Sequence, residues 1–131
     1  MAAFSNYLED QITGWIAGTS MTAPTATFVQ LYNGDPTDAG SGGTALYSRV
    51  SVASGTGSWT RGTGGNGTIT NASAVTITSS ATATASATHV AVWDASAAGN
   101  LLFFGALTTA KTIAVGDEVK FNTSALTLTV A

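Results

Sequence analysis

The sequence predicts a mainly β protein: an antiparallel β-sandwich of jelly-roll-like form, with about eight short strands and one short N-terminal α-helix. Helical spacing of apolar residues occurs once, within residues 1–20. After it, apolar and polar residues alternate in short runs that are separated by turn residues, with no helices between them. A chain of 131 residues is near the commonest size of one domain, so we expect residues 1–131 to form a single β domain.

The predicted helix lies in the segment 1–20. Its apolar residues fall on one stripe, made up of Phe4, Leu8, Ile12, Trp15 and Ile16. Asn6 is suited to cap the helix, which places Glu9 in the positively polarised first turn, and Gly18 is suited to end it. We expect the stripe to cover the local core as a lid; the alternative is that it anchors the chain onto a neighbouring subunit.

The strands follow in order along the rest of the chain. We expect them at residues 25–32, 46–52, 74–78, 88–93, 101–107, 111–115, 118–121 and 125–130. The run "LLFFGAL" at 101–107 is apolar on both faces, which is typical of a strand in the centre of a sheet. "NGDP", which begins at Asn33, has the residues of a turn.

Residues 53–67 are rich in Gly and Ser and are predicted to form a long flexible loop. Nothing local in the sequence would bury Trp59, so we expect it in a subunit interface, with a ligand contact as the alternative. "GTGGNG" at 62–67 matches a dinucleotide-binding string, but it lacks the helix and the later acidic residue that such a site needs.

The charge content excludes several classes of partner. Charged residues make up 8% of the chain, against about 25% in an ordinary domain. With four basic residues and a net charge of −3, we expect no binding to nucleic acid and none to anionic membranes. We also expect neither a signal peptide nor a membrane span. A surface so short of charge is suited to contact other subunits.

Catalytic chemistry is nearly absent from the sequence. His89 and Asp94 are five residues apart on a predicted strand and turn, so they would face opposite sides of the sheet. We therefore expect His89 to be half-buried among aromatic residues and Asp94 to begin a turn, and we expect no enzyme activity and no cofactor. No metal site is predicted, although a cation near Asp35 and Asp38 stays open.

Three stretches carry a resemblance to a known family: "SNYLEDQI", "LYNGDPTDAGSGGTALYSRVSV" and the run from "THVAVWDA" through "FGAL" to "ALTLTV". They resemble small virion proteins of tailed bacteriophages, which are often labelled tail fibre proteins and which include capsid decoration, or cement, proteins. The resemblance leaves only about residues 53–72 uncovered. None of the shared motifs is a catalytic signature.

The resemblance implies a non-enzymatic cement protein on the outer surface of the phage head, made in the cytoplasm of the bacterial host. Its implied partners are itself, as a homotrimer, and the major capsid protein of the same phage. The alternative is a tail-associated fibre or adhesion protein that binds a host surface glycan. The candidate interface residues are Phe4, Tyr7, Trp15, Arg49, Trp59 and Arg61. For Arg49 and Arg61, a surface salt bridge or a solvated charge is the alternative.

Overall fold

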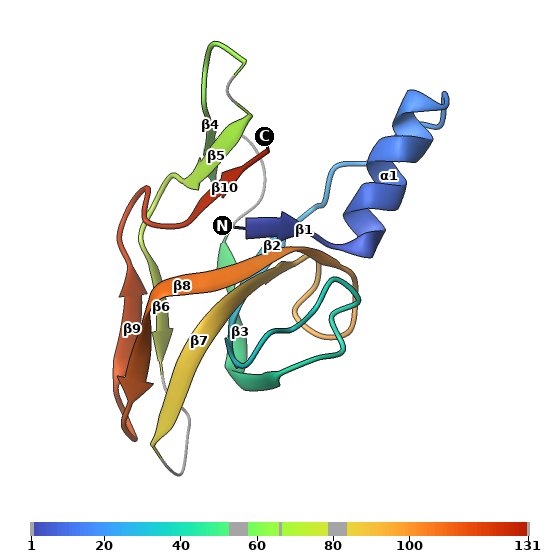
Figure 1. The fold of residues 1–131 in the computed structure, drawn as a ribbon. Coiled ribbons are helices and arrows are strands. Elements are labelled where there is room, and N and C mark those ends of the chain that lie inside the picture. Colours follow the sequence, from blue (N-terminus) through green and yellow to red (C-terminus); the bar gives the residue numbers. More distant parts are fainter. Residues whose placement is uncertain (1, 53–57, 66, 79–83, 131) are drawn as a thin grey trace.

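The computed structural model describes residues 2–52, 58–65, 67–78 and 84–130 (Figure 1). The described residues form one helix and ten strands. In chain order these are β1 (Ala2–Phe4), α1 (Asn6–Ile16), β2 (Thr27–Asn33), β3 (Thr44–Val52), β4 (Trp59–Arg61), β5 (Thr68–Asn71), β6 (Val75–Thr78), β7 (Ala85–Trp93), β8 (Leu101–Ile113), β9 (Glu118–Phe121) and β10 (Thr127–Thr129). The predicted antiparallel β-sandwich with one short N-terminal helix is confirmed.

The main sheet has five antiparallel strands in the order β1-β8-β7-β2-β3. Its central strand pair is β2 and β7, whose register places Val29 opposite Val92 and Leu31 opposite Val90. Val29 and Leu31 point to the same face of this sheet and are fully buried in the main core. The apolar centre of "TFVQLYN" fits a strand in this position.

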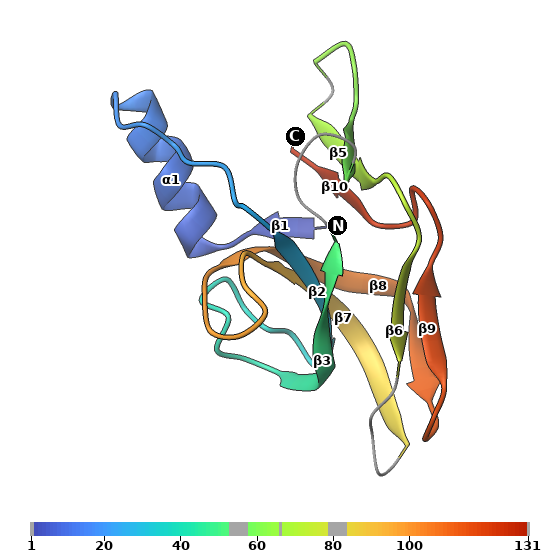
Figure 2. The same ribbon diagram turned by 180° about the vertical axis from the view of Figure 1, so that it is seen from behind.

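Two small sheets cover one face of the main sheet, as Figure 2 shows from behind. One pairs β6 with β9, and the other has the order β10-β5-β4. The core lies between these layers and is built from aliphatic side chains of both: Val29, Leu31, Val52, Val75, Ile77, Val92, Leu102, Ile113 and Leu126 among others. This burial of apolar surface is the main stabilising term of the fold.

The opposite face of the main sheet has a second, smaller core of Tyr32, Ala91, Trp93 and Leu101. Two loops, residues 34–43 and 94–100, lie over it. Gly40 is so close that a side chain there would meet the indole of Trp93. Main-chain carbonyls of the second loop accept hydrogen bonds from Arg49, described below. On this side, loops rather than a sheet therefore cover the main sheet.

Three differences from the predicted strands have simple causes. The expected strands 101–107 and 111–115 are one strand, β8, because β7 pairs with it as far as Ile113. The loop predicted at 53–67 contains β4, which pairs with β5 across a turn where Gly64 and Gly65 have positive φ. Residues 53–57 and 66 of that predicted loop lie outside the described residues. β1 and β5, of three and four residues, were not predicted.

The helix differs from its prediction in two respects. Its N-cap is Ser5 rather than Asn6, and Phe4 lies before it on β1. None of the eleven residues of α1 is buried, so the expected lid on the local core is wrong. Figures 1 and 2 show α1 projecting from the body, on the side away from β9. Within the described chain, no helix has the length and apolarity that crossing a membrane requires.

Candidate interaction surfaces

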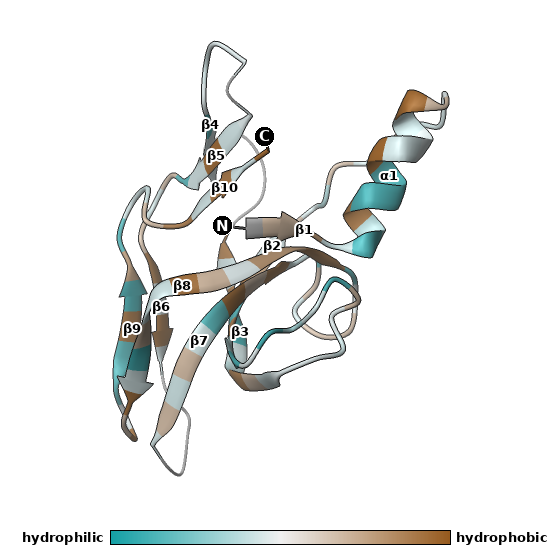
Figure 3. Cartoon of the chain, in the orientation of Figure 1, coloured by the Kyte–Doolittle hydropathy of each residue, from teal (hydrophilic) through white to brown (hydrophobic). Residues whose placement is uncertain are grey.

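The first surface is a projecting arm, which we define as α1 and the loop 17–26. Its free end exposes three large apolar side chains: Trp15 is 63% exposed, Ile16 73% and Met21 43%. Figure 3 shows the apolar residues at this end of α1. Exposed apolar side chains that stand together mark an interaction surface more often than those that are scattered singly. We call Trp15, Ile16 and Met21 the arm tip.

The base of the arm is fixed to the main sheet by hydrogen bonds. The Ser5 hydroxyl donates to the Leu101 carbonyl oxygen and accepts from the Leu8 amide at 3.1 Å. The Ser5 amide donates to Leu102 O and the Asn6 amide to Asp38 O, both at 3.0 Å. Because these bonds tie the first turn to the body at several points, the arm leaves the body in a defined direction.

Two further candidate interface residues lie at the arm's base. Tyr7, in the first turn of α1, is 37% exposed. Phe4 is half-buried on β1, opposite Phe103 of β8. The structure thus brings Phe4, Tyr7 and Trp15 to the arm and its root, whereas the other three candidates lie elsewhere. Whether any of the six contacts another chain stays a prediction.

The side chain of Arg49, on β3, binds to other groups of its own chain. Its guanidinium carbon is 3.8 Å from the centroid of the Trp93 ring. Its Nη1 donates hydrogen bonds to the carbonyl oxygens of Ala95 and Ala98, at 2.8 and 2.7 Å. Its Nε donates a hydrogen bond to Gln30 Oε1 at 3.1 Å. Burial lowers the pKa of Arg49, while the charges of Tyr32 and Asp94 oppose that shift. The expected alternative of a solvated surface charge is wrong, because the side chain binds loop carbonyls and an aromatic face.

Trp59 and Arg61 lie on β4. The Trp59 indole Nε1 donates to Thr27 Oγ1 at 3.0 Å, and its ring meets the edge of Phe103 with 5.8 Å between centroids. Nothing local in the sequence buries Trp59, as expected, but residues distant in the sequence do, and the ring packs half-buried against the main core. Arg61 is exposed at the end of the strand, opposite Ile69. An intersubunit role for either residue stays a prediction.

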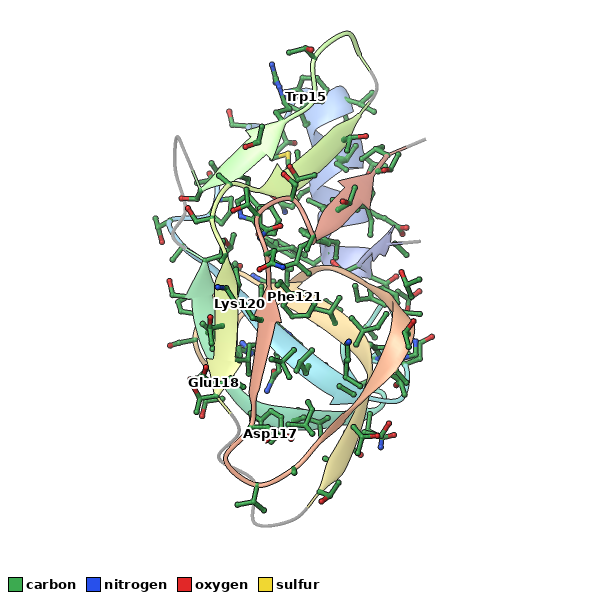
Figure 4. All side chains as sticks on the ribbon, turned by 90° about the vertical axis from the view of Figure 1, so that its left-hand side faces the viewer. Trp15, Asp117, Glu118, Lys120 and Phe121 are labelled. Atoms are coloured by element: carbon green, nitrogen blue, oxygen red, sulfur yellow. The ribbon has the colours of Figure 1, made fainter. Side chains whose placement is uncertain are left out.

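The second surface is an apolar groove between β8 and the segment that joins β9 to β10. It has a volume of about 270 Å³. Val92 and Leu126 form its buried base, Phe103, Leu107 and Phe121 form half-buried walls, and the rim is exposed. Phe121 is labelled in Figure 4, which looks onto this side of the molecule. Sequence reasoning missed the groove, since its lining comes from residues 90–127 on separate elements.

The strands beside the groove have unpaired edges. β1 pairs with β8 only as far as Gly105, and β9 pairs with β6 alone. Among the described residues, no strand therefore lies on the outer edge of β8 from Ala106 onwards. Unpaired edges of this kind are sites at which another chain can bind.

The residues considered for chemistry are not brought together. His89 Nδ1 lies 2.9 Å from Thr88 Oγ1, and Asp94 accepts hydrogen bonds from the amide and side chain of Asn100 at 2.6 and 2.8 Å. Asp94 thus holds a turn, as expected. Asp35 Oδ1 accepts from the Thr37 amide at 2.8 Å. Over the ranges that the structure describes, no three acidic or histidine side chains gather as a metal-binding group.

Comparison with known proteins places the chain in a family. No curated protein matches it. The family model described as Podophage GP4 fiber I protein gp80 matches residues 3–129, which is nearly the whole chain and includes the arm, the groove and both sheet layers. The chain therefore belongs to the Podophage GP4 fiber I protein gp80 family, a family of structural proteins of phage particles.

Proposed function

We propose that this chain is a non-enzymatic structural subunit of a podophage particle, that it assembles as a homotrimer, and that it stands in a tail fibre. The observation that carries the proposal is the arm, whose apolar tip no part of the described chain covers. A side chain as large as Trp15, held out into water by a fixed base, is most simply explained by contact with another protein. The family name supports a place in the fibre.

The composition supports assembly as the function. Only 8% of the residues are charged, and the surface is largely Thr, Ser and Ala. Such a surface can be buried against a second protein without leaving unpaired charges in the interface, a cost that burying an isolated charge would impose. In an oligomer, several weak contacts act together, so modest individual affinities give a durable assembly.

Head decoration is the second candidate function. In that role the chain would bridge subunits of the major capsid protein as a cement protein on the outer surface of the head. A body with few charged residues suits a flat contact with a shell. The printed family name fits this role less directly than the fibre.

The copy number of the chain per particle separates the two candidates. We would measure it against the major capsid protein in purified virions by quantitative mass spectrometry. A fibre subunit is expected in a small number of copies per particle, whereas a cement protein is expected near one copy for each capsid subunit. Absence of the chain from purified virions would contradict both.

Binding of a host surface glycan is a separate prediction for a fibre subunit. A ligand that binds only the folded chain raises its apparent stability in proportion to the logarithm of ligand concentration. Thermal unfolding with and without host-derived saccharides measures this. No shift with any host saccharide would leave the chain a structural part of the fibre and would contradict a role in adhesion.

A further inference from the structure

The arm tip and the groove are two surfaces of one chain, both without charged side chains, that the chain itself cannot bring together. Figures 1 and 2 agree that α1 points away from the side on which β9 and β10 lie. The base of the arm is tied to Leu101, Leu102 and Asp38 by hydrogen bonds, which fix that direction. Each surface is therefore left for a different molecule.

Both surfaces lack charge. The sequence has no acidic or basic residue between Asp10 and Asp35, a stretch that includes the whole arm tip, and no acidic or basic residue lines the groove. On β9, the exposed Glu118 and Lys120 alternate with Val119 and Phe121, so the charges face outward while the apolar side chains face the core and the groove (Figure 4). Contact between the two surfaces would bury no unpaired charge.

The groove has the size of one large side chain. Its volume of about 270 Å³ is below the roughly 300–1,000 Å³ of pockets that hold small-molecule ligands. Phe103 and Phe121 form its walls, and aromatic rings favour another aromatic ring in edge or offset contact. Trp15 is the most exposed aromatic residue of the described chain, so its indole is the natural occupant.

We infer that the arm tip of one copy docks in the groove of a second copy, with Trp15 between β8 and the β9–β10 segment. The inference rests on the proposed function, because it names the contact by which the subunits would assemble. Every copy of the chain carries both an arm tip and a groove. Docking of one into the other therefore covers both of these exposed surfaces. Since the two surfaces differ, the contact is head-to-tail, and repeating it gives a ring such as a trimer where the rotation between copies closes, and an open filament where it does not.

Disulfide trapping between two single-cysteine variants tests this directly, because the natural chain has no cysteine. Ile16→Cys places a thiol on the arm tip and Ala125→Cys places one on the exposed groove rim. When the two variants are mixed and oxidised, a disulfide between them is expected. The matched control pairs Ile16→Cys with Val115→Cys, a position 61% exposed but outside the groove, where no specific disulfide is expected.

Two outcomes of the trapping experiment would contradict the inference. Disulfides formed only among copies of Ile16→Cys would mean that arms pack against arms, and the inference would be wrong. Absence of a disulfide between Ile16→Cys and Ala125→Cys would also overturn it. Either failure is distinct from failure of the proposed function, which is judged by the presence of the unaltered chain in purified particles.

Self-association of the full chain provides a second test. In sedimentation equilibrium, Trp15→Ala is expected to weaken association by at least about thirty-fold, as for an aromatic residue at the centre of an interface. Val115→Ala, which removes an equally exposed apolar side chain elsewhere, is expected to leave it unchanged. Equal effects of the two substitutions, or no effect of either, would overturn the inference.

Discussion

The guanidinium of Arg49 lies over the indole ring of Trp93, with 3.8 Å between the guanidinium carbon and the ring centroid. The same side chain donates to the carbonyl oxygens of Ala95 and Ala98 in the loop that follows Trp93. One cation thus joins β3 to the end of β7 and to the loop beyond it. This contact fixes the loop-covered face of the main sheet, where no second sheet is present to do so.

Replacing Arg49 by Lys tests whether the planar guanidinium matters beyond its charge. Lys keeps the positive charge, but its ammonium is not planar and cannot donate to several acceptors while it lies over the Trp93 ring. The free energy of unfolding is therefore expected to fall by about 2 kcal/mol. Urea denaturation measures it. Arg61→Lys on exposed β4 serves as the control and is expected to change stability by less than about 0.5 kcal/mol. Equal stability of the two variants would contradict this role.

The pKa of Tyr32 predicts how the free energy of unfolding depends on pH in the alkaline range. Burial raises the pKa of Tyr32 above its ordinary value of 10.0, and the charge of Arg49 opposes only part of that shift. The folded chain therefore keeps the phenol proton at pH values where the unfolded chain loses it. The contribution of the Tyr32 phenol to the free energy of unfolding is fully present below pH 10.0. It is lost as pH rises through the higher pKa of the folded state.

The measurement is the free energy of unfolding from pH about 9 to pH about 11. We expect stability to fall over this range in the unaltered chain, and to fall less steeply in Tyr32→Phe. Tyr7→Phe, which alters an exposed tyrosine on α1, is expected to retain the slope of the unaltered chain. A slope that Tyr32→Phe leaves unchanged would mean that another group carries the dependence.

Ser5→Ala tests the attachment of the arm. The Ser5 hydroxyl caps α1 and bonds to a carbonyl of β8, so its removal is expected to cost about 1–2 kcal/mol and to increase amide exchange in α1. Asn6→Ala is the matched control at the neighbouring position, where the cap was predicted, and is expected to cost less than about 0.5 kcal/mol. Hydrogen exchange read by mass spectrometry measures both. The reverse order of effects would contradict the cap.

Asn71 is the polar side chain on which the second layer depends. It is fully buried, donates to the carbonyl oxygens of Ser73 and Asn122 at 2.8 and 2.9 Å, and accepts from the Leu126 amide at 2.9 Å. Asn71→Ala leaves these main-chain groups unpaired, and a loss of about 3 kcal/mol is expected in thermal or urea unfolding. Asn122→Ala keeps the carbonyl and is expected to be near neutral. A tolerated Asn71→Ala would refute the role.

Local patterns in the sequence predicted the long strands well. The alternation in residues 88–93 and the apolar run in 25–32 identify β7 and β2, because each strand's own side chains record which faces are buried. The distal half of β8 carries exposed Thr and Ala on both faces, so its sequence has no pattern that indicates a buried face. Pairing with β7 alone extends this strand to Ile113.

Long-range contacts decided the features that the sequence could not predict. Ser5 and Asn6 are both good capping residues, and the choice of Ser5 accompanies a bond to Leu101, which is 96 positions away. Trp59 is half-buried because Thr27 and Phe103 reach it from other strands. The groove likewise has no local signal. By contrast, the low content of charged residues can be seen in the composition, and it predicts a chain suited to assembly.

The central claim is that the chain is a structural part of the phage particle, and its place there can be seen directly. We would label intact, purified virions with gold-conjugated antibody against the chain and locate the gold by electron microscopy. Label is expected on the fibres at the tail, whereas label spread over the head would show that the chain is a decoration protein. Particles that carry no label, while the same antibody detects the chain in lysates of infected cells, would contradict the account.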